Sequence, residues 1–157
     1  MESAKPQKEH EWLQQLVGDW RFEAPSKDPD CNHTGTETVR SIGGLWIQAE
    51  GRSQMPDGQP SVMMLTLGYD PQKEKFVGTW LGSMMTYLWV YEGSLDPTGK
   101  ILSLDTEGPS CTEEGKMAKY REVIEIKDPD HRVFTSSVSG ADGKWQTIMT
   151  AKYTRVK

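Results

Sequence analysis

Residues 86–107 read TYLWVYEGSLDPTGKILSLDTE and carry the clearest signal of the fold. Two runs rich in apolar residues, 86–95 and 100–107, flank Asp96-Pro97-Thr98-Gly99, which is typical of a turn. In the first run aromatic side chains stand at every second position, at Tyr87, Trp89 and Tyr91. This spacing is that of a β-strand whose two faces differ. The stretch therefore predicts an antiparallel β-hairpin.

The same pattern extends along the rest of the chain. Turn signals such as Asp70-Pro71, Asp128-Pro129 and Asp142-Gly143 separate segments of about eight to twelve residues, the spacing of strands in sandwiches and barrels. The expected strands are 20–24, 36–42, 45–54, 61–69, 75–81, 86–95, 100–107, 117–127, 132–139 and 144–155. Because closure removes exposed sheet edges, the sequence predicts an all-β fold, a ten-stranded antiparallel up-and-down β-barrel.

One segment has the periodicity of a helix. In residues 9–17, Trp12, Leu13, Leu16 and Val17 fall on one face, and Gly18 is suited to end the helix. We expect a short N-terminal helix whose apolar face covers one end of the barrel. The length predicts a single domain over residues 1–157, with residues 1–8 flexible.

Composition excludes several classes of function. The 157 residues include 18 Lys and Arg and 23 Asp and Glu, and the net charge of −5 argues against nucleic acid as a partner. No apolar run is long enough to span a membrane, and the first residues lack the apolar core of a secretion signal. The two cysteines, Cys31 and Cys111, are expected to be free thiols. The predicted location is therefore the cytoplasm.

The motif Gly18-Asp19-Trp20 opens the first expected strand. Glycine lets the chain turn tightly out of the helix, and the Trp20 indole N–H can reach a carbonyl at the end of the barrel. Arg155 supplies a cation that stacks on Trp20 if the last strand pairs with the first. We expect Trp20 and Arg155 to hold the barrel closed rather than to bind a ligand.

Further motifs spread over nearly the whole chain: Leu16-Val17-Gly18-Asp19-Trp20, Gly43-Gly44-Leu45-Trp46, Leu67-Gly68-Tyr69-Asp70-Pro71, Phe76-Val77-Gly78-Thr79-Trp80, Leu88-Trp89-Val90-Tyr91-Glu92-Gly93, Gly115-Lys116-Met117 with Tyr120-Arg121, and Asp142-Gly143-Lys144-Trp145. Together they resemble a bacterial family of domains of unknown function, the fifteen-seventy-nine family. The Gly-x-Trp motif before antiparallel strands also resembles the calycin superfamily of lipocalins and fatty-acid-binding proteins. The resemblance implies a calycin-like barrel and supplies no established catalytic residue.

Metal and cofactor chemistry is not predicted. Cys31 and His33 make one pair of metal ligands, without the second pair that a tetrahedral site needs. A haem ligand should project from the wall into an apolar cavity, whereas His131 follows Asp128-Pro129-Asp130 at an expected turn. We therefore expect no metal and no cofactor.

Large, adaptable side chains indicate a binding function instead. The chain holds six Trp, five Tyr and eight Met, and Met side chains fill irregular cavities and accept varied ligands. An eight-stranded barrel can be filled by side chains, whereas wider barrels leave space. We predict a small, apolar or amphipathic ligand inside the barrel. The candidate ligand-binding residues are Trp46, Glu50, Met64, Trp80, Tyr87, Trp89, Glu107, Tyr120, Arg121 and Met149, the last sharing a strand face with Trp145, Thr147, Ala151 and Tyr153.

Acidic residues interrupt the apolar strands at Glu37, Glu50, Glu92, Glu107 and Glu122. Because a buried carboxylate is costly unless paired, any of them that faces inward should pair with an arginine or have a raised pKa. An inward Glu beside a Tyr or Arg is the basis of an alternative hypothesis, a small-molecule enzyme. A further alternative is a non-catalytic homo-oligomeric interaction module, such as a homodimer, that uses the outer face of the barrel.

Overall fold

The computed structural model describes residues 1–25 and 33–157. Over these residues the chain forms one short helix and ten strands. The elements are α1 (Lys8–Gln14), β1 (Gly18–Ala24), β2 (His33–Ile42), β3 (Trp46–Gln54), β4 (Pro60–Asp70), β5 (Lys75–Gly82), β6 (Trp89–Leu95), β7 (Ile101–Pro109), β8 (Met117–Asp128), β9 (His131–Ser139) and β10 (Trp145–Arg155).

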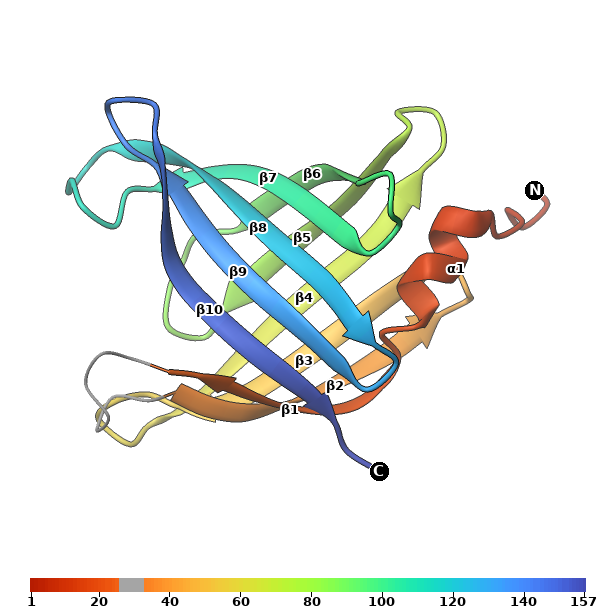
Figure 1. The fold of residues 1–157 in the computed structure, drawn as a ribbon, viewed down its shortest axis with the longest axis horizontal. Helices are drawn as coiled ribbons and strands as arrows, with labels where there is room; N and C mark the ends of the chain where they lie inside the picture. Colours follow the sequence, from red (N-terminus) through yellow and green to blue (C-terminus); the bar gives the residue numbers. More distant parts are fainter. Residues whose placement is uncertain (26–32) are drawn as a thin grey trace.

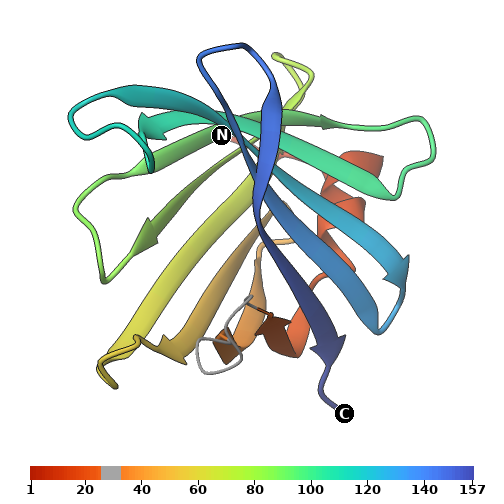
Figure 2. The ribbon, with the colours of Figure 1, turned by 60° about the vertical axis from the view of Figure 1, so that its left-hand side comes forward.

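The described strands close on themselves into one barrel (Figures 1 and 2). Each strand pairs antiparallel with its neighbours in the sequence, and β1 pairs with β10 from Trp20–Arg155 to Glu23–Lys152. The predicted fold, a closed ten-stranded antiparallel barrel with a short N-terminal helix, is confirmed. Closure pairs the first strand with the last and so removes the free edges of the sheet.

Several predicted boundaries differ from the structure by one to three residues, and two of these differences have a visible local basis. The strand expected from residue 86 begins at Trp89, because the chain first turns at Gly82, whose carbonyl accepts from the Met85 N–H at 3.2 Å. The helix expected over 9–17 spans Lys8–Gln14. Beyond it, the Leu16 N–H donates to the Leu13 carbonyl at 3.0 Å, so the chain continues in tighter turns.

Helix α1 covers one end of the barrel, beside β3 and β4 (Figure 1). Leu13 of the helix is 0% exposed, and Leu16, in the turn that follows the helix, is 2% exposed. The Trp12 indole N–H donates to the carbonyl of Gly99 in the β6–β7 turn at 2.6 Å. The Trp20 indole N–H donates to the Leu16 carbonyl at 2.8 Å. These contacts tie the helix to β1 and to the turn between β6 and β7.

A bulge in β10 overturns one expectation about strand faces. The pairing with β9 shifts by one residue between Thr147 and Met149, so Ile148 is an extra residue. Met149 therefore shares the inner face with Ala151, whereas Trp145 and Thr147 lie on the outer face. The expected alternation placed all of these side chains together, which was wrong because one inserted residue exchanges the two faces.

The structure bears in part on two further expectations, the absence of a membrane span and the free cysteines. Among the described residues, no helix combines the length and the apolar character needed to cross a membrane. Cys111 is an exposed free thiol. Cys31 lies outside the described residues, and so does the metal pair that it would form with His33.

Candidate functional site

The inward-facing side chains are buried to different degrees along the barrel. Toward α1, Ile47, Leu67, Phe76, Leu102 and Ile124 are at most 2% exposed. At the same end, inward-facing Tyr69, Leu95 and Ile126 are half-buried. Farther from α1, inward-facing apolar side chains stay partly accessible, namely Met63, Leu65, Trp80, Trp89 and Phe134. In the half of the barrel away from α1, these five side chains are the apolar part of the inner wall that solvent reaches.

Aromatic rings gather on one wall of the half away from α1. Trp89 lies edge-to-face with Tyr87 and with Tyr120, with centroid separations of 5.1 and 5.0 Å. The Tyr87 hydroxyl donates to the Glu107 carbonyl at 2.8 Å and so joins the β5–β6 loop to β7. Gly108 lies under the Trp89 ring, where an added Cβ would come within 2.1 Å of it. This glycine therefore makes room for the indole.

An ion pair crosses the interior nearer to α1. Glu37 on β2 and Arg132 on β9 are joined by a salt bridge, with side chains only 11% and 5% exposed. The Arg132 guanidinium also lies over the Trp20 ring at 4.6 Å and the Tyr153 ring at 4.0 Å. An arginine partner was expected for any inward carboxylate, and here that partner is Arg132. The partner is 95 residues away in the sequence, and only barrel closure brings it near.

A second carboxylate faces the interior without a cation. Glu122 on β8 is 8% exposed, and its Oε1 accepts a hydrogen bond from the Ser136 hydroxyl at 3.0 Å. Its Oε2 is buried and has no hydrogen-bond partner among the described residues. Burial raises the pKa of the Glu122 carboxyl to about 7, and the bond from Ser136 opposes part of this shift. The inward carboxylates thus follow both predicted outcomes, since one is paired and the other has a raised pKa.

Two tyrosines lie close enough to sense this carboxylate. Burial raises the pKa of Tyr91, and the negative charge of Glu122 adds to the shift. Burial likewise raises the pKa of Tyr120, with smaller contributions from Cys111 and Glu122. The Tyr120 hydroxyl donates to the Pro109 carbonyl at 2.7 Å. Diagonal to Glu122 on the inner face, Thr106 carries a buried hydroxyl that has no partner among the described residues.

The predicted ligand-binding residues divide between the two faces of the wall. Trp80, Trp89, Tyr120 and Met149 face inward, and Tyr87 packs on Trp89. The register places the others on the outer face: Trp46, Glu50, Met64, Glu107 and Arg121. These five were expected to line the interior or to orient a ligand there, and the structure corrects this. Each of them stands next to an inward-facing residue of its strand, and successive side chains of a strand point to opposite faces.

The outer carboxylates have ordinary surface partners. Glu50 pairs with Arg52 at 3.3 Å, and Glu92 pairs with Lys73 at 3.0 Å. On β8, Arg121 pairs with Asp105 at 2.8 Å and lies 4.5 Å from the centre of the Trp145 ring. In the alternative hypothesis of a small-molecule enzyme, the candidate carboxylates are therefore the inward-facing Glu37 and Glu122.

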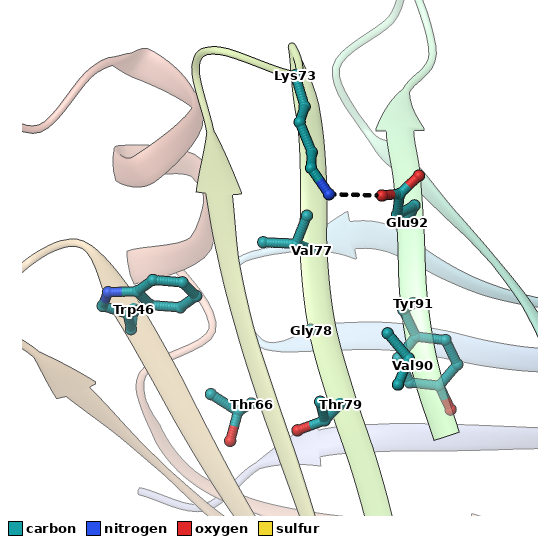
Figure 3. Close-up of a pocket in the computed structure, with 9 residues that line it drawn as sticks. All are labelled: Trp46, Thr66, Lys73, Val77, Gly78, Thr79, Val90, Tyr91 and Glu92. Carbon is teal, nitrogen blue, oxygen red and sulfur yellow. Dashed lines mark hydrogen bonds and ion pairs between the residues drawn. The ribbon is translucent and has the colours of Figure 1, made fainter. Parts of the chain in front are cut away.

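The outer face carries a shallow hollow of about 290 Å³ over β4, β5 and β6. Trp46 closes one side of it, and the Lys73–Glu92 ion pair closes another (Figure 3). Outward-facing Val77 and Val90 form part of its floor (Figure 3). Most of its lining side chains point away from the core, and the lining also includes Tyr91 of the inner face.

A second hollow, of about 620 Å³, lies where the wall divides between β6 and β7. These strands pair from Glu92–Asp105 to Leu95–Leu102, whereas β7 continues along β8 as far as Pro109. Besides outer-face side chains, Thr106 and Tyr120 of the inner face line this hollow. The split therefore brings the outer surface close to the inner wall beside Glu122.

The three histidines have protein partners. His10 accepts from the Gln7 N–H at 2.9 Å, and His33 hydrogen-bonds the Ser53 hydroxyl at 3.0 Å. His131 lies 2.8 Å from an Asp128 carboxylate oxygen in the β8–β9 turn. Across residues 1–25 and 33–157, no group of three or more His, Cys, Asp or Glu side chains is placed to hold a metal ion.

Comparison with solved structures supports the fold. Rv2717c from M. tuberculosis is similar with a TM-score of 0.64 and 14% identity, over 98% of this chain and 100% of that one. A de novo designed fluorescence-activating β-barrel gives a TM-score of 0.50 and 14% identity over 91% and 95% of the two chains. The barrel EF1p2_mFAP2b, solved bound to DFHBI, gives 0.50 and 14% over 94% and 99%. At these identities the likeness shows the fold alone.

Sequence comparison identifies the family. No match was found among curated proteins. The model of a family described as a protein of unknown function, DUF1579, matches residues 5–155. This match covers the helix and all ten described strands, in agreement with the resemblance drawn from the motifs. The chain therefore belongs to the DUF1579 family.

Proposed function

We propose that this protein binds a small, partly apolar molecule inside the half of the barrel that lies away from α1. The observation that carries the proposal is the partial accessibility of inward-facing Met63, Trp80 and Trp89, beside sealed residues nearer the helix. Rings and thioethers offer an apolar surface that adapts to varied shapes. Polar groups next to this surface, including Glu122, would fix the orientation of the bound molecule.

Barrels of similar fold are compatible with this role. One of them was solved with the small molecule DFHBI bound, and another is described as fluorescence-activating. Their identity to this chain is only 14%. They therefore support the idea that a barrel of this architecture can bind a small molecule, and they do not indicate a particular ligand.

A neutral hydrophobic dye, N-phenyl-1-naphthylamine, tests the proposal. Its fluorescence should rise on binding to the wild-type protein. Trp80→Ala and Trp89→Ala should each weaken dye binding by about tenfold, because each removes a large apolar contact from the inner wall. Trp46→Ala is the matched control, since Trp46 is 40% exposed on the outer face.

Two results would count against the interior site. If Trp46→Ala abolished binding while the inner variants retained it, the dye would occupy the outer hollow instead. If neither the dye nor a panel of lipids and metabolites bound in native mass spectrometry, the proposed function would be wrong. Gel filtration at several concentrations tests the homodimer, which stays a prediction.

A further inference from the structure

One interior carboxyl group among the described residues has no cationic partner. The interior carboxyl groups are Glu37 and Glu122, and Glu37 is already joined to Arg132. The other guanidinium at the α1 end, Arg155, donates to the carbonyls of Gln15, Val17 and Pro129. Glu122 receives one hydrogen bond from a neutral hydroxyl, and its second oxygen is unpartnered. Because a buried charge is costly unless paired, the interior has a place for one positive charge.

The surroundings of Glu122 also favour a cation. The titratable groups that sense its charge are Tyr91 from β6 and Tyr120 from β8. Tyr120 packs edge-to-face with Trp89 at 5.0 Å, so aromatic rings border this part of the wall. The faces of such rings attract ammonium groups. Thr106, diagonal to Glu122, adds a buried hydroxyl oxygen with a free acceptor position.

We propose that the bound molecule carries a protonated amine on an apolar body. The ammonium group donates to Glu122 and Thr106, and the apolar body lies against Trp80 and Trp89. An alcohol would satisfy one acceptor but leave the charge unpaired, and a carboxylate would add a second negative charge. This inference rests on the proposed function, because it identifies the chemical class of the same ligand.

Three probes with one aromatic body test it: 2-phenylethylamine, 2-phenylethanol and phenylacetate, titrated by calorimetry. At pH 8 the amine should bind about tenfold or more tightly than either of the others, because a charge-assisted bond to a buried carboxylate is stronger than a neutral one. Glu122→Gln should remove this advantage and leave the affinity for the alcohol within about threefold. Glu125→Gln is the matched control, because Glu125 lies on the same strand with its side chain turned outward to Lys127.

The wild-type protein gives a second readout that needs no variant. From pH 8 to pH 5.5, protonation of Glu122 should weaken amine binding by about 30-fold, whereas binding of the alcohol should stay nearly constant. Equal affinities for the three probes, or an amine preference that persists in Glu122→Gln, would overturn this inference and leave the proposed function standing. Failure of all three probes and of the naphthylamine dye would overturn both.

Discussion

The guanidinium carbon of Arg155 lies 4.3 Å from the centre of the Trp20 indole ring, and the two residues are partners in the β1–β10 pairing. Arg155 also donates to the carbonyls of Gln15 and Val17, at 2.8 and 2.7 Å, in the chain between α1 and β1. The same indole also meets the guanidinium of Arg132 at 4.6 Å. Trp20 thus joins the helix, the first strand and the two last strands at the covered end of the barrel.

Arg155→Ala should destabilise the protein by about 2 kcal/mol, because it removes a cation–π contact and several hydrogen bonds to carbonyls. Arg155→Lys should recover only part of this, since an ammonium cannot bridge the same carbonyls while lying flat on the ring. Urea unfolding measures both. Arg52→Ala, which removes an exposed pair with Glu50, should cost less than about 1 kcal/mol. Equal effects of Arg155→Ala and Arg52→Ala would contradict the closing role of Arg155.

Arg132→Met should be more damaging, by about 3–5 kcal/mol, because it leaves Glu37 buried without its partner. The double variant Glu37→Gln/Arg132→Met should regain much of that stability, since no unpaired charge remains. Chemical denaturation of the single and double variants gives the coupling energy. Additive losses in the double variant would show that the pair is not the source of the effect.

Glu122→Gln should make stability less dependent on pH. The folded-state pKa of about 7 lies above the ordinary value of 4.5, so the folded protein binds more protons between these two pH values. Wild-type stability should therefore fall as pH rises from about 4.5 to 7, by an amount on the order of 3 kcal/mol, and then level off. The Gln variant should resemble the wild type near pH 4.5 and exceed it at pH 8. Thermal melts across this range check the prediction, with Glu125→Gln as the control, and a wild-type curve parallel to that of Glu122→Gln would refute it.

Gly108→Ala should displace the Trp89 ring, because the new Cβ would come within 2.1 Å of it. The near-ultraviolet circular dichroism of the tryptophans should change, and binding of the naphthylamine dye should weaken by about tenfold or more. Gly140→Ala is a suitable control, since its Cβ would meet the movable Asp142 carboxylate at 3.1 Å and no ring. Unaltered dye binding by Gly108→Ala would remove Trp89 from the proposed site.

The number and order of the strands, the covering helix and the family could all be predicted from the sequence. Each of these depends on local signals, namely turn residues, alternation and short motifs, which need no knowledge of distant contacts. The expectation that an inward carboxylate is either paired or has a raised pKa also needed only general electrostatics, and Glu37 and Glu122 satisfy it in turn.

Which side chains face inward becomes known only from the pairing of the strands in three dimensions. Trp46 and Trp80 look alike in the sequence, yet one lies on the outer surface and the other on the inner wall. The bulge at Ile148 exchanges the faces of β10 within a continuous strand, and closure brings Arg132 to Glu37 across 95 residues. The physical reason is that a strand's faces alternate at every residue, so its orientation depends on pairing with other strands, and pairing partners far apart in the chain leave no local signal.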